Sequence, residues 1–367
     1  MPTSPGLGKA GRGETIQEER VKVLNKKPIH KGGYVLYWMQ ASQRAEYNHA
    51  LEYGILKANE LRLPILVFFG ITDHFPEANE RHYAFMLEGL REVKESLQQR
   101  GIQMVISHKP PEAGAVSFAR QAAMVVVDRG YLKIQREWRA YVAQQVDCPL
   151  IQVESDVIVP AEEASPKEEY SAATFRPKVT RKLDRFLVPL KENHPIKGSL
   201  SFDFGSFDIS DLEKAISRLP IDRSVKRVSY FQGGTNQAKK HLQIFLREKM
   251  DRYPEFRNDP NLDCLSHLSP YLHFGYISPL EVALAVRDYA AAHQLMAEEY
   301  LEELIVRREL AFNFVRYAKS VASLEELPEW ARVTLDKHRK DRRDPTYTGE
   351  QFESAATCDD LWNATEK

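Results

Sequence analysis

The sequence has few cysteines and no long apolar segment. Three cysteines in 367 residues, Cys148, Cys264 and Cys358, are too few and too far apart for a disulfide framework, and no Cys-x-x-Cys pair indicates a zinc site. No apolar run reaches the ~18 residues that span a bilayer, and residues 1–33 lack the apolar core of a signal peptide. The sequence therefore predicts a cytoplasmic protein with no membrane partner.

A strong overall charge is also missing. Lys and Arg number 51 against 52 Asp and Glu, which gives a formal net charge of −1. Any DNA site must therefore be a local basic patch. One candidate lies within residues 332–343, and a solvated charged helix face is the alternative interpretation. The other candidate, with the same alternative, consists of Arg176, Lys178, Arg181, Lys182 and Arg185.

The usual phosphate-binding loop of dinucleotide enzymes is absent. After the first apolar run the chain reads Met-Gln-Ala-Ser-Gln-Arg over residues 39–44, where such enzymes have a Gly-x-Gly-x-x-Gly loop. A Rossmann-type dehydrogenase is therefore disfavoured. Gln40, Ser42 and Arg44 stand where a ligand could be met, and a helix-capping role for Ser42 is an equal alternative.

What the sequence does contain is a series of short apolar runs in its first half. Hydrophobic residues make up 43% of the chain, so sizeable cores are expected. The 10 to 20 residue intervals between the runs carry helical periodicity, clearest over 81–99. This alternation predicts a doubly wound parallel β-sheet covered by helices, with a ligand crevice beyond the carboxyl ends of the strands. The expected strands are 34–39, 64–70, 104–107, 124–128 and 150–154.

The second half reads as mostly helical. Residues 1–32 are expected to form a flexible polar arm, 33–155 the α/β domain, 156–205 an interdomain linker and 206–367 an all-α domain. Thr235 is the expected N-cap of one helix. Another helix is expected from about Glu298 to Tyr317, with an ion pair between Glu303 and Arg307 at i,i+4 spacing.

The segment from Cys264 to Glu281 predicts two helix starts in succession. Ser269 precedes a proline suited to the first helical position, Gly275 can end that helix, and 278–281 form a capping box. A helix N-terminus next to serine and histidine side chains offers donors to an anion such as phosphate. Two capped helices in a hydrophobic core are the alternative.

These motifs together resemble the DNA photolyase family. Residues 302–314, Glu-Glu-Leu-Ile-Val-Arg-Arg-Glu-Leu-Ala-Phe-Asn-Phe, look specifically like the class II cyclobutane pyrimidine dimer photolyases. The resemblance covers nearly the whole chain from about residue 33 and keeps the order of the segments. The other segments that carry it are Tyr34–Gln40, Gly233–Gly234, Ala238, Leu242, Phe245, Tyr253–Pro254, Arg257–Pro260, Leu265–Ser278 and Leu361–Ala364.

The resemblance implies a light-driven flavoenzyme that repairs pyrimidine dimers in DNA by electron transfer from reduced FAD. It implies that Tyr253 and Arg257 line the FAD site, that Arg307 meets FAD or its phosphate, and that Glu303 hydrogen-bonds the dimer, with Glu302 as an alternative. A second antenna chromophore is possible in the α/β domain. The residues implied to hold the diphosphate and ribityl parts of FAD are Leu265, Ser266, His267, Leu268 and Ser269.

The resemblance also suggests where the chain departs from the family. Family members continue well past the Leu-Trp-Asn-Ala motif, whereas three residues follow it here. We therefore expect the C-terminal part of the flavin-binding domain to be missing. The chain would then be a monomer unless a second chain completes the flavin pocket. The alternatives are a shortened or split enzyme, a non-catalytic remnant that binds DNA or flavin weakly, and, less favoured, a cryptochrome-like light sensor.

Overall fold

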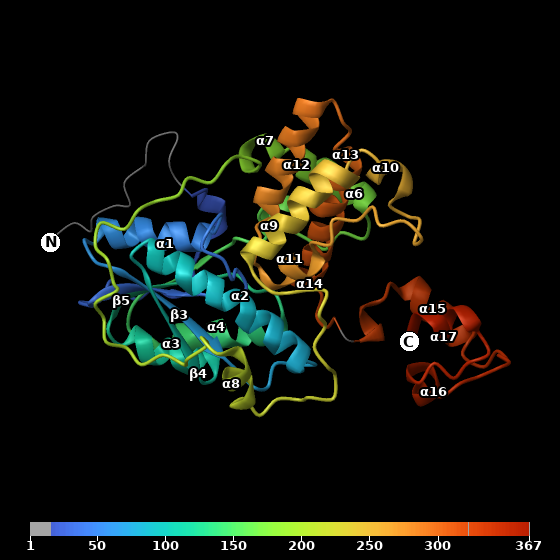
Figure 1. The fold of residues 1–367 in the computed structure, drawn as a ribbon, viewed down its shortest axis with the longest axis horizontal. Coiled ribbons are helices and arrows are strands. Elements are labelled where there is room, and N and C mark those ends of the chain that lie inside the picture. The colour runs from blue at the N-terminus through green and yellow to red at the C-terminus, as the bar shows by residue number, and fades with distance from the viewer. Residues whose placement is uncertain (1–15, 322, 367) are drawn as a thin grey trace. The chain divides into compact units, whose positions relative to one another are not determined.

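The computed structural model describes residues 16–321 and 323–366, so the first fifteen residues of the predicted polar arm lie outside the described part. The described residues form two compact units, the first ending at Tyr317 and the second beginning at Ala318. The first unit contains a β-sheet with its covering helices, followed by a group of helices (Figure 1). The second unit holds a short 3₁₀ turn and the helices α15 (Glu329–Lys337), α16 (Gly349–Glu353) and α17 (Asp360–Glu366).

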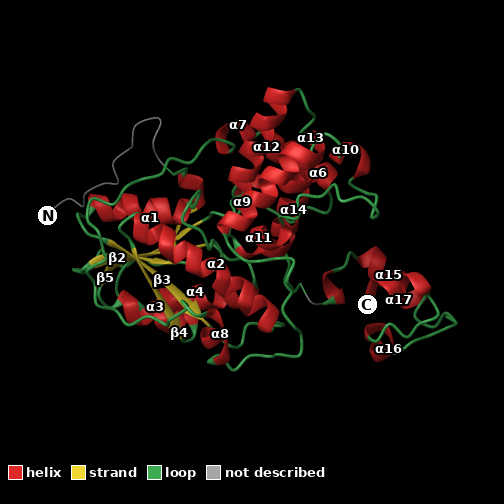
Figure 2. Cartoon of the chain, in the orientation of Figure 1, coloured by secondary structure: helices red, strands yellow, loops and turns green. Residues whose placement is uncertain are grey.

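The sheet has six strands in the order β1-β6-β5-β2-β3-β4 (strands in Figure 2). Strands β2 to β6 run parallel to one another, as predicted. Strands β3 and β4 follow β2 on one side of the sheet, and β5 and β6 lie on the other side of β2. The strands are β2 (Tyr34–Trp38), β3 (Ile65–Ile71), β4 (Gln103–His108), β5 (Ala122–Asp128) and β6 (Leu150–Val153).

Both faces of the sheet are buried. Alternate residues of β2 enter different cores: Val35 and Tyr37 pack with α1 and α2, whereas Leu36 and Trp38 pack with α3 and α4. A strand covered on both sides needs apolar residues at every position, which explains the continuous apolar runs in the sequence. The helices are α1 (His49–Glu60), α2 (Glu80–Gln99), α3 (Pro111–Ala119) and α4 (Lys133–Gln145).

The prediction of an all-parallel sheet was wrong at one edge. Residues Val21–Val23 form strand β1, which pairs antiparallel with β6. This strand lies inside the segment predicted to be a flexible arm. It was missed because it is only three residues long, is interrupted by a lysine and is half exposed, so it carries no apolar run.

Apart from α8 (Leu212–Ser217), which packs against α2 and the core of the sheet, the remaining helices of the first unit form a group beside the sheet (Figure 1). The predicted linker contributes to the core, because Val157, Ile158 and Val159 are at most 1% exposed. The helices that follow β6 are α5 (Ala161–Ala164), α6 (Ala172–Thr180), α7 (Leu183–Phe186), α8 (Leu212–Ser217), α9 (Thr235–Ile244), α10 (Tyr253–Phe256), α11 (Ser269–Phe274), α12 (Pro279–His293), α13 (Glu298–Leu301) and α14 (Arg308–Tyr317).

Two stretches of these helices have π geometry. Phe245–Lys249 continues α9, and Glu302–Arg307, labelled η3, joins α13 to α14. The helix predicted from Glu298 to Tyr317 is therefore present and changes its winding in the middle. In a π-helix the backbone hydrogen bonds join residues five apart instead of four, so side-chain neighbours change as well.

The predicted helix caps were partly right. Gly275 ends α11 with a φ of +75°, and the Ser278 side chain caps α12 by accepting the N–H of Leu280. The N-cap of α9 is Gly234 instead of Thr235, whose hydroxyl donates to the Tyr276 carbonyl. The N-cap of α11 is Leu268, so Ser269 is the first helical residue.

The end of α11 docks directly on the loop that follows β2. A Cβ atom at Gly275 would stand 2.0 Å from the Ala41 carbonyl oxygen, so only glycine allows this approach. The Arg44 guanidinium donates to the Gly275 carbonyl at 3.0 Å, and the Tyr276 hydroxyl donates to the Met86 carbonyl at 2.6 Å. The helical group is thus held against the carboxyl edge of the sheet.

Candidate functional site

A cavity of about 1040 Å³ lies between the carboxyl edge of the sheet and the helical group. One wall comes from the residues that follow β2, β3 and β5. The other wall comes from the loop before α11, from α11 itself and from η3 and α14. The strand order reverses around β2, and such a reversal point is where open α/β sheets bind ligands. The predicted crevice is therefore present, and the helical group covers it.

The helical wall contains the segment singled out in the sequence. All five residues from Leu265 to Ser269 line the cavity. None of the N–H groups of residues 265–268 donates a hydrogen bond to another residue in the described part of the chain. The Ser266 hydroxyl accepts the Tyr300 hydroxyl at 3.0 Å. The N–H groups of this loop are therefore not used by other described residues.

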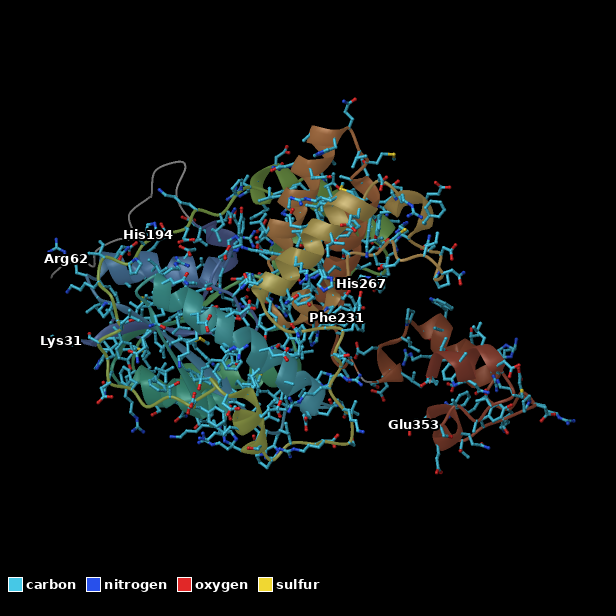
Figure 3. The ribbon with its side chains drawn as sticks, in the orientation of Figure 1. Lys31, Arg62, His194, Phe231, His267 and Glu353 are labelled. Atoms are coloured by element: carbon cyan, nitrogen blue, oxygen red, sulfur yellow. The ribbon has the colours of Figure 1, made fainter. Side chains whose placement is uncertain are left out.

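His267 is held in a specific conformation within this loop. Its φ of +55° is unusual for a residue with a side chain. Its Nε2 atom lies 2.6 Å from Asp263 Oδ1, and Asp263 also pairs with Lys249 at 2.8 Å. Figure 3 shows His267 beside Phe231, and the two ring centroids are 6.2 Å apart. The contacts with Asp263 and Phe231 hold the loop against the cavity.

Glu303 of η3 and Tyr253 of α10 both line this cavity. Arg257 Nη1 donates to Glu303 Oε1 at 2.8 Å, and the same guanidinium lies over the Tyr253 ring. Burial raises the pKa of Tyr253, which therefore stays protonated near neutral pH. Tyr253, Arg257 and Glu303 thus form one connected group, of which Tyr253 and Glu303 line the cavity and Arg257 does not.

The predicted ion pair between Glu303 and Arg307 was wrong. Arg307 pairs instead with Glu302, with 3.4 Å between Nε and Oε1. The reason is the π geometry of η3, which brings residues five apart together. The Arg307 side chain is 55% exposed and does not line the cavity.

Glu302 also lies outside the cavity and faces the predicted DNA-binding residues. Arg176 makes two hydrogen bonds to its carboxylate, at 2.6 and 2.9 Å. Of the other predicted residues, Lys178 pairs with Glu169, Lys182 pairs with Glu163, and Arg181 donates to a carbonyl of its own helix. The DNA-binding role of this group stays a prediction.

The strand-end wall contains a carboxylate that sequence reasoning missed. Asp128, the last residue of β5, is fully buried and accepts the N–H groups of Gln40, Ala41 and Ser42 at 2.8, 2.5 and 2.6 Å. Burial, together with the nearby charge of Asp156, raises the pKa of Asp128 to about 6, although these N–H donors partly offset the shift. The loop that could have held a phosphate is thus occupied by the protein's own carboxylate.

The structure shows which of the three candidate ligand-binding residues after β2, Gln40, Ser42 and Arg44, reach the cavity. Gln40 lines the cavity, and its Nε2 atom is buried without a hydrogen-bond partner among the described residues. Ser42 and Arg44 both bind Asp156 and are buried, so they are structural. The alternative role of Ser42 as a helix cap was wrong, because Asn48 caps α1.

Aromatic side chains complete the cavity. They come from separate parts of the chain, and no local sequence signal linked them. Tyr131 after β5 and Phe312 on α14 both line the cavity and contact each other edge to face, with ring centroids 4.8 Å apart. A flavin dinucleotide combines a flat apolar ring with an anionic diphosphate, and such ligands fill largely apolar pockets with a few placed polar groups. The aromatic walls and the free N–H donors of residues 265–268 fit that chemistry.

The fold defines a protein in which a helical group covers the carboxyl edge of an α/β sheet and leaves a large cavity between the two. The sequence profile described as DNA photolyase matches residues 35–196. A protein of Methanothermobacter thermautotrophicus named deoxyribodipyrimidine photo-lyase is 48% identical over 355 residues, which is 96% of this chain and 77% of that protein. The chain belongs to the DNA photolyase family.

Solved structures agree with the fold. The Synechocystis sp. PCC6803 cryptochrome matches with a TM-score of 0.64 at 17% identity, over 92% of this chain and 71% of that chain. An archaeal photolyase from Sulfolobus tokodaii, described with two FAD molecules, matches with a TM-score of 0.61 at 16% identity, over 90% and 69%. Among the described residues, no helix is both long and apolar enough to cross a membrane.

Proposed function

We propose that this protein uses reduced FAD and light to split cyclobutane pyrimidine dimers in DNA. One observation carries the proposal: a single cavity of about 1040 Å³ collects Tyr253, Glu303 and the whole segment 265–269. These are residues that the resemblance to class II photolyases implies at the FAD and dimer sites. The related enzyme named deoxyribodipyrimidine photo-lyase supports the same reaction.

The loop 265–268 is proposed to hold the diphosphate of FAD. Its N–H groups have no other partner in the described part of the chain, and the Ser266 hydroxyl can donate because it already accepts from Tyr300. When bound, reduced FAD supplies an electron to the dimer after it absorbs light. The protein positions the two reactants and excludes water from the space between them.

Glu303 is proposed to hydrogen-bond a base of the dimer. Photolyases take their target bases out of the duplex, and the cavity has room to receive them. Arg257 fixes the Glu303 carboxyl group through the 2.8 Å hydrogen bond. The positive charge of Arg257 also favours negative charge on a base carbonyl close to Glu303.

The remaining proposed contacts involve DNA phosphates and a second chromophore. DNA phosphates would contact the basic group Arg176, Lys178, Arg181 and Lys182. Three of these four side chains already form ion pairs with Glu302, Glu169 and Glu163, so the phosphates must compete with those carboxylates. Arg307, on the exposed side of η3, would meet a phosphate of the cofactor or of the DNA. A second chromophore would lie on the strand-end wall of the cavity.

The test is light-dependent repair by the purified full chain. An oligonucleotide with one thymine dimer is incubated with the FAD-loaded protein in the dark and under near-ultraviolet or blue light. We expect dimer loss in the light only. The proposal is contradicted if flavin-loaded protein leaves the dimer intact under light.

Two variants test the role of Glu303. Glu303→Gln should lower the repair rate about tenfold at unchanged flavin content, since one charged hydrogen bond contributes about 1.5 kcal/mol or more. Glu302→Gln is the matched control, because Glu302 is the neighbouring residue but faces Arg176 outside the cavity. It should repair at a rate within about twofold of the wild type. Equal losses in both variants would argue against a direct role for Glu303.

A further inference from the structure

A second, smaller cavity of about 320 Å³ lies on the other side of residues 129–131, which line both cavities. Its walls come from β1, β6, the end of β5, α4 and α14. Five cationic side chains line it, and no acidic residue is among the described residues of its lining. The five are Lys22, Arg129, Arg136, Arg139 and Arg316.

The cations come from different elements that meet at this point. Lys22 belongs to β1, Arg136 and Arg139 to α4, and Arg316 to α14. A charged face of one helix would carry its charges along a single element and turn them toward water. Here the fold gathers charges from β1, from the end of β5, from α4 and from α14 around one concave space, which is the arrangement expected of a built site.

The positive charge is only partly balanced within the protein. Arg129 pairs with Glu154 and Glu162 at 2.8 and 2.5 Å, and Arg316 shares Glu162 at 2.8 Å. These two carboxylates leave a surplus of three positive charges. Neither Lys22 nor Arg136 has an ion-pair partner in the described part of the chain.

Arg139 is buried and likewise has no ion-pair partner in the described part of the chain. Its side chain is 8% exposed, and its hydrogen bond is to the Gly130 carbonyl at 2.6 Å. Burial lowers its pKa to about 10, and the nearby Asp128 charge offsets only part of that shift. In Arg129, burial acts in the same direction, but Glu154 and Glu162 outweigh it and the pKa is raised.

A buried amide completes the lining. Gln152 of β6 is 6% exposed and lines the cavity. It stands directly opposite Lys22 in the antiparallel pair of β1 and β6, so both side chains lie on the same face. An amide donor and a lysine thus point to the same place as the two arginines of α4.

We propose that this second cavity binds the phosphate group of a small anion, either inorganic phosphate or a phosphomonoester. Guanidinium groups bind phosphate oxygens through paired N–H donors, and several of them around one anion satisfy its charge from different directions. A volume of about 320 Å³ admits a phosphate with a small organic part. The site is separate from the cavity assigned to FAD and to the dimer.

The test is to titrate the purified full chain with inorganic phosphate and to measure binding by ³¹P NMR and calorimetry. Ribose 5-phosphate is the second ligand, and ribose is the uncharged control. We expect saturable binding with a Kd of about 1 mM or below for at least one phosphate ligand and none for ribose. Equal affinities would identify inorganic phosphate as sufficient, whereas tighter binding of the ester would identify a phosphomonoester.

Two variants locate the binding. Arg136→Glu should weaken phosphate binding at least about tenfold, since it replaces an attraction with a repulsion at short range. Arg91→Glu reverses a charge on the exposed face of α2, outside the cavity, and should leave the affinity within about twofold. Gln152→Glu places a carboxylate among the cations in nearly the same shape and should abolish phosphate binding in a folded protein.

The proposal is overturned by any of three results. The first is no saturable phosphate binding to the wild type. The second is equal weakening by Arg136→Glu and Arg91→Glu, which would show a general effect of surface charge. The third is unchanged binding in Gln152→Glu, which would place the phosphate elsewhere.

Discussion

Two loops that line the main cavity differ in whether their backbone N–H groups donate hydrogen bonds within the protein. The loop after β2 gives the N–H groups of Gln40, Ala41 and Ser42 to the carboxylate of Asp128. The loop before α11 leaves the N–H groups of residues 265–268 without partners in the described structure. One loop is closed to anions by the protein itself, and the other is open to them.

The comparison shows where an anionic cofactor can bind. In many α/β proteins the first strand-end loop receives a phosphate. Here that position already holds a buried negative charge, which would repel a second one. Of the two loops, the one before α11 is therefore the one to which we assign the diphosphate in the proposed FAD complex. The α/β sheet serves as a wall and as a support for α11.

The largest expected effect comes from giving the open loop a charge of its own. Ser266→Asp places a carboxylate beside the proposed diphosphate, and repulsion of about 4 kcal/mol at 4 Å should weaken FAD binding by two to three orders of magnitude. Fluorescence titration of the apoprotein with FAD measures this change. Ser210→Asp, on an exposed turn of the α/β side, is the control and should bind FAD as the wild type does. Tight FAD binding by Ser266→Asp would contradict the claim that the loop before α11 holds the diphosphate.

A smaller effect is expected from opening the closed loop. Asp128→Asn turns an amide N–H₂ group toward at least one buried backbone N–H, and an unsatisfied buried donor costs about 1–3 kcal/mol of folding free energy. Urea unfolding should show this loss. Asp147→Asn changes a carboxylate whose side chain is 90% exposed and should cost little. Equal stability of Asp128→Asn and the wild type would mean that the hydrogen bonds to Asp128 contribute nothing net.

A pH-dependent effect is expected at a second buried carboxylate that accepts backbone N–H groups. Glu309 on α14 accepts from Ile158 and Val159, and burial raises its pKa to about 7. The folded state then binds the proton more tightly than the unfolded state, so this group lowers stability as pH rises from about 4.5 to 7.

Glu309→Gln removes that titration. Its stability relative to the wild type should rise by about 1 kcal/mol between pH 5 and pH 6, because only the wild type loses stability from this residue. Urea unfolding of both proteins at the two pH values gives the difference and cancels the titration of all other groups. A difference that stays constant or falls with pH would show that Glu309 titrates in its ordinary range.

The smallest effect concerns the support of the open loop. Asp263→Asn weakens the contacts to His267 and Lys249, both of them to a partly exposed carboxylate, so a loss of at most about 1 kcal/mol is expected. FAD affinity should fall less than about fivefold. Asp288→Asn, which removes an exposed pair with Arg287 on α12, is the control. A loss as large as that of Ser266→Asp would mean that His267 itself carries the binding.

The sequence predicted the elements around both loops, and the FAD-binding role of residues 265–269 stays a prediction. The five parallel strands could be predicted because each is a continuous apolar run buried on both faces. Strand β1 could not, since Val21–Val23 is short and half exposed. The open loop could be predicted from residues 264–281, where serine, histidine, proline and glycine stand close together in the sequence.

Contacts between distant residues could not be predicted. Asp128 lies 86 to 88 residues from the N–H groups it accepts, and nothing local to residues 124–128 indicates that role. The pairing of Glu303 was mispredicted because standard α-helical spacing was assumed, whereas η3 has π geometry. Arg257, the actual partner of Glu303, is 46 residues away.

The most direct test of the central claim is the visible absorption spectrum of the full chain after incubation with FAD and removal of free cofactor. The central claim is that the open loop and the cavity beside it hold FAD. We predict flavin bands near one FAD per chain for the wild type and almost none for Ser266→Asp. A colourless wild type, or equal flavin content in both proteins, would contradict the claim.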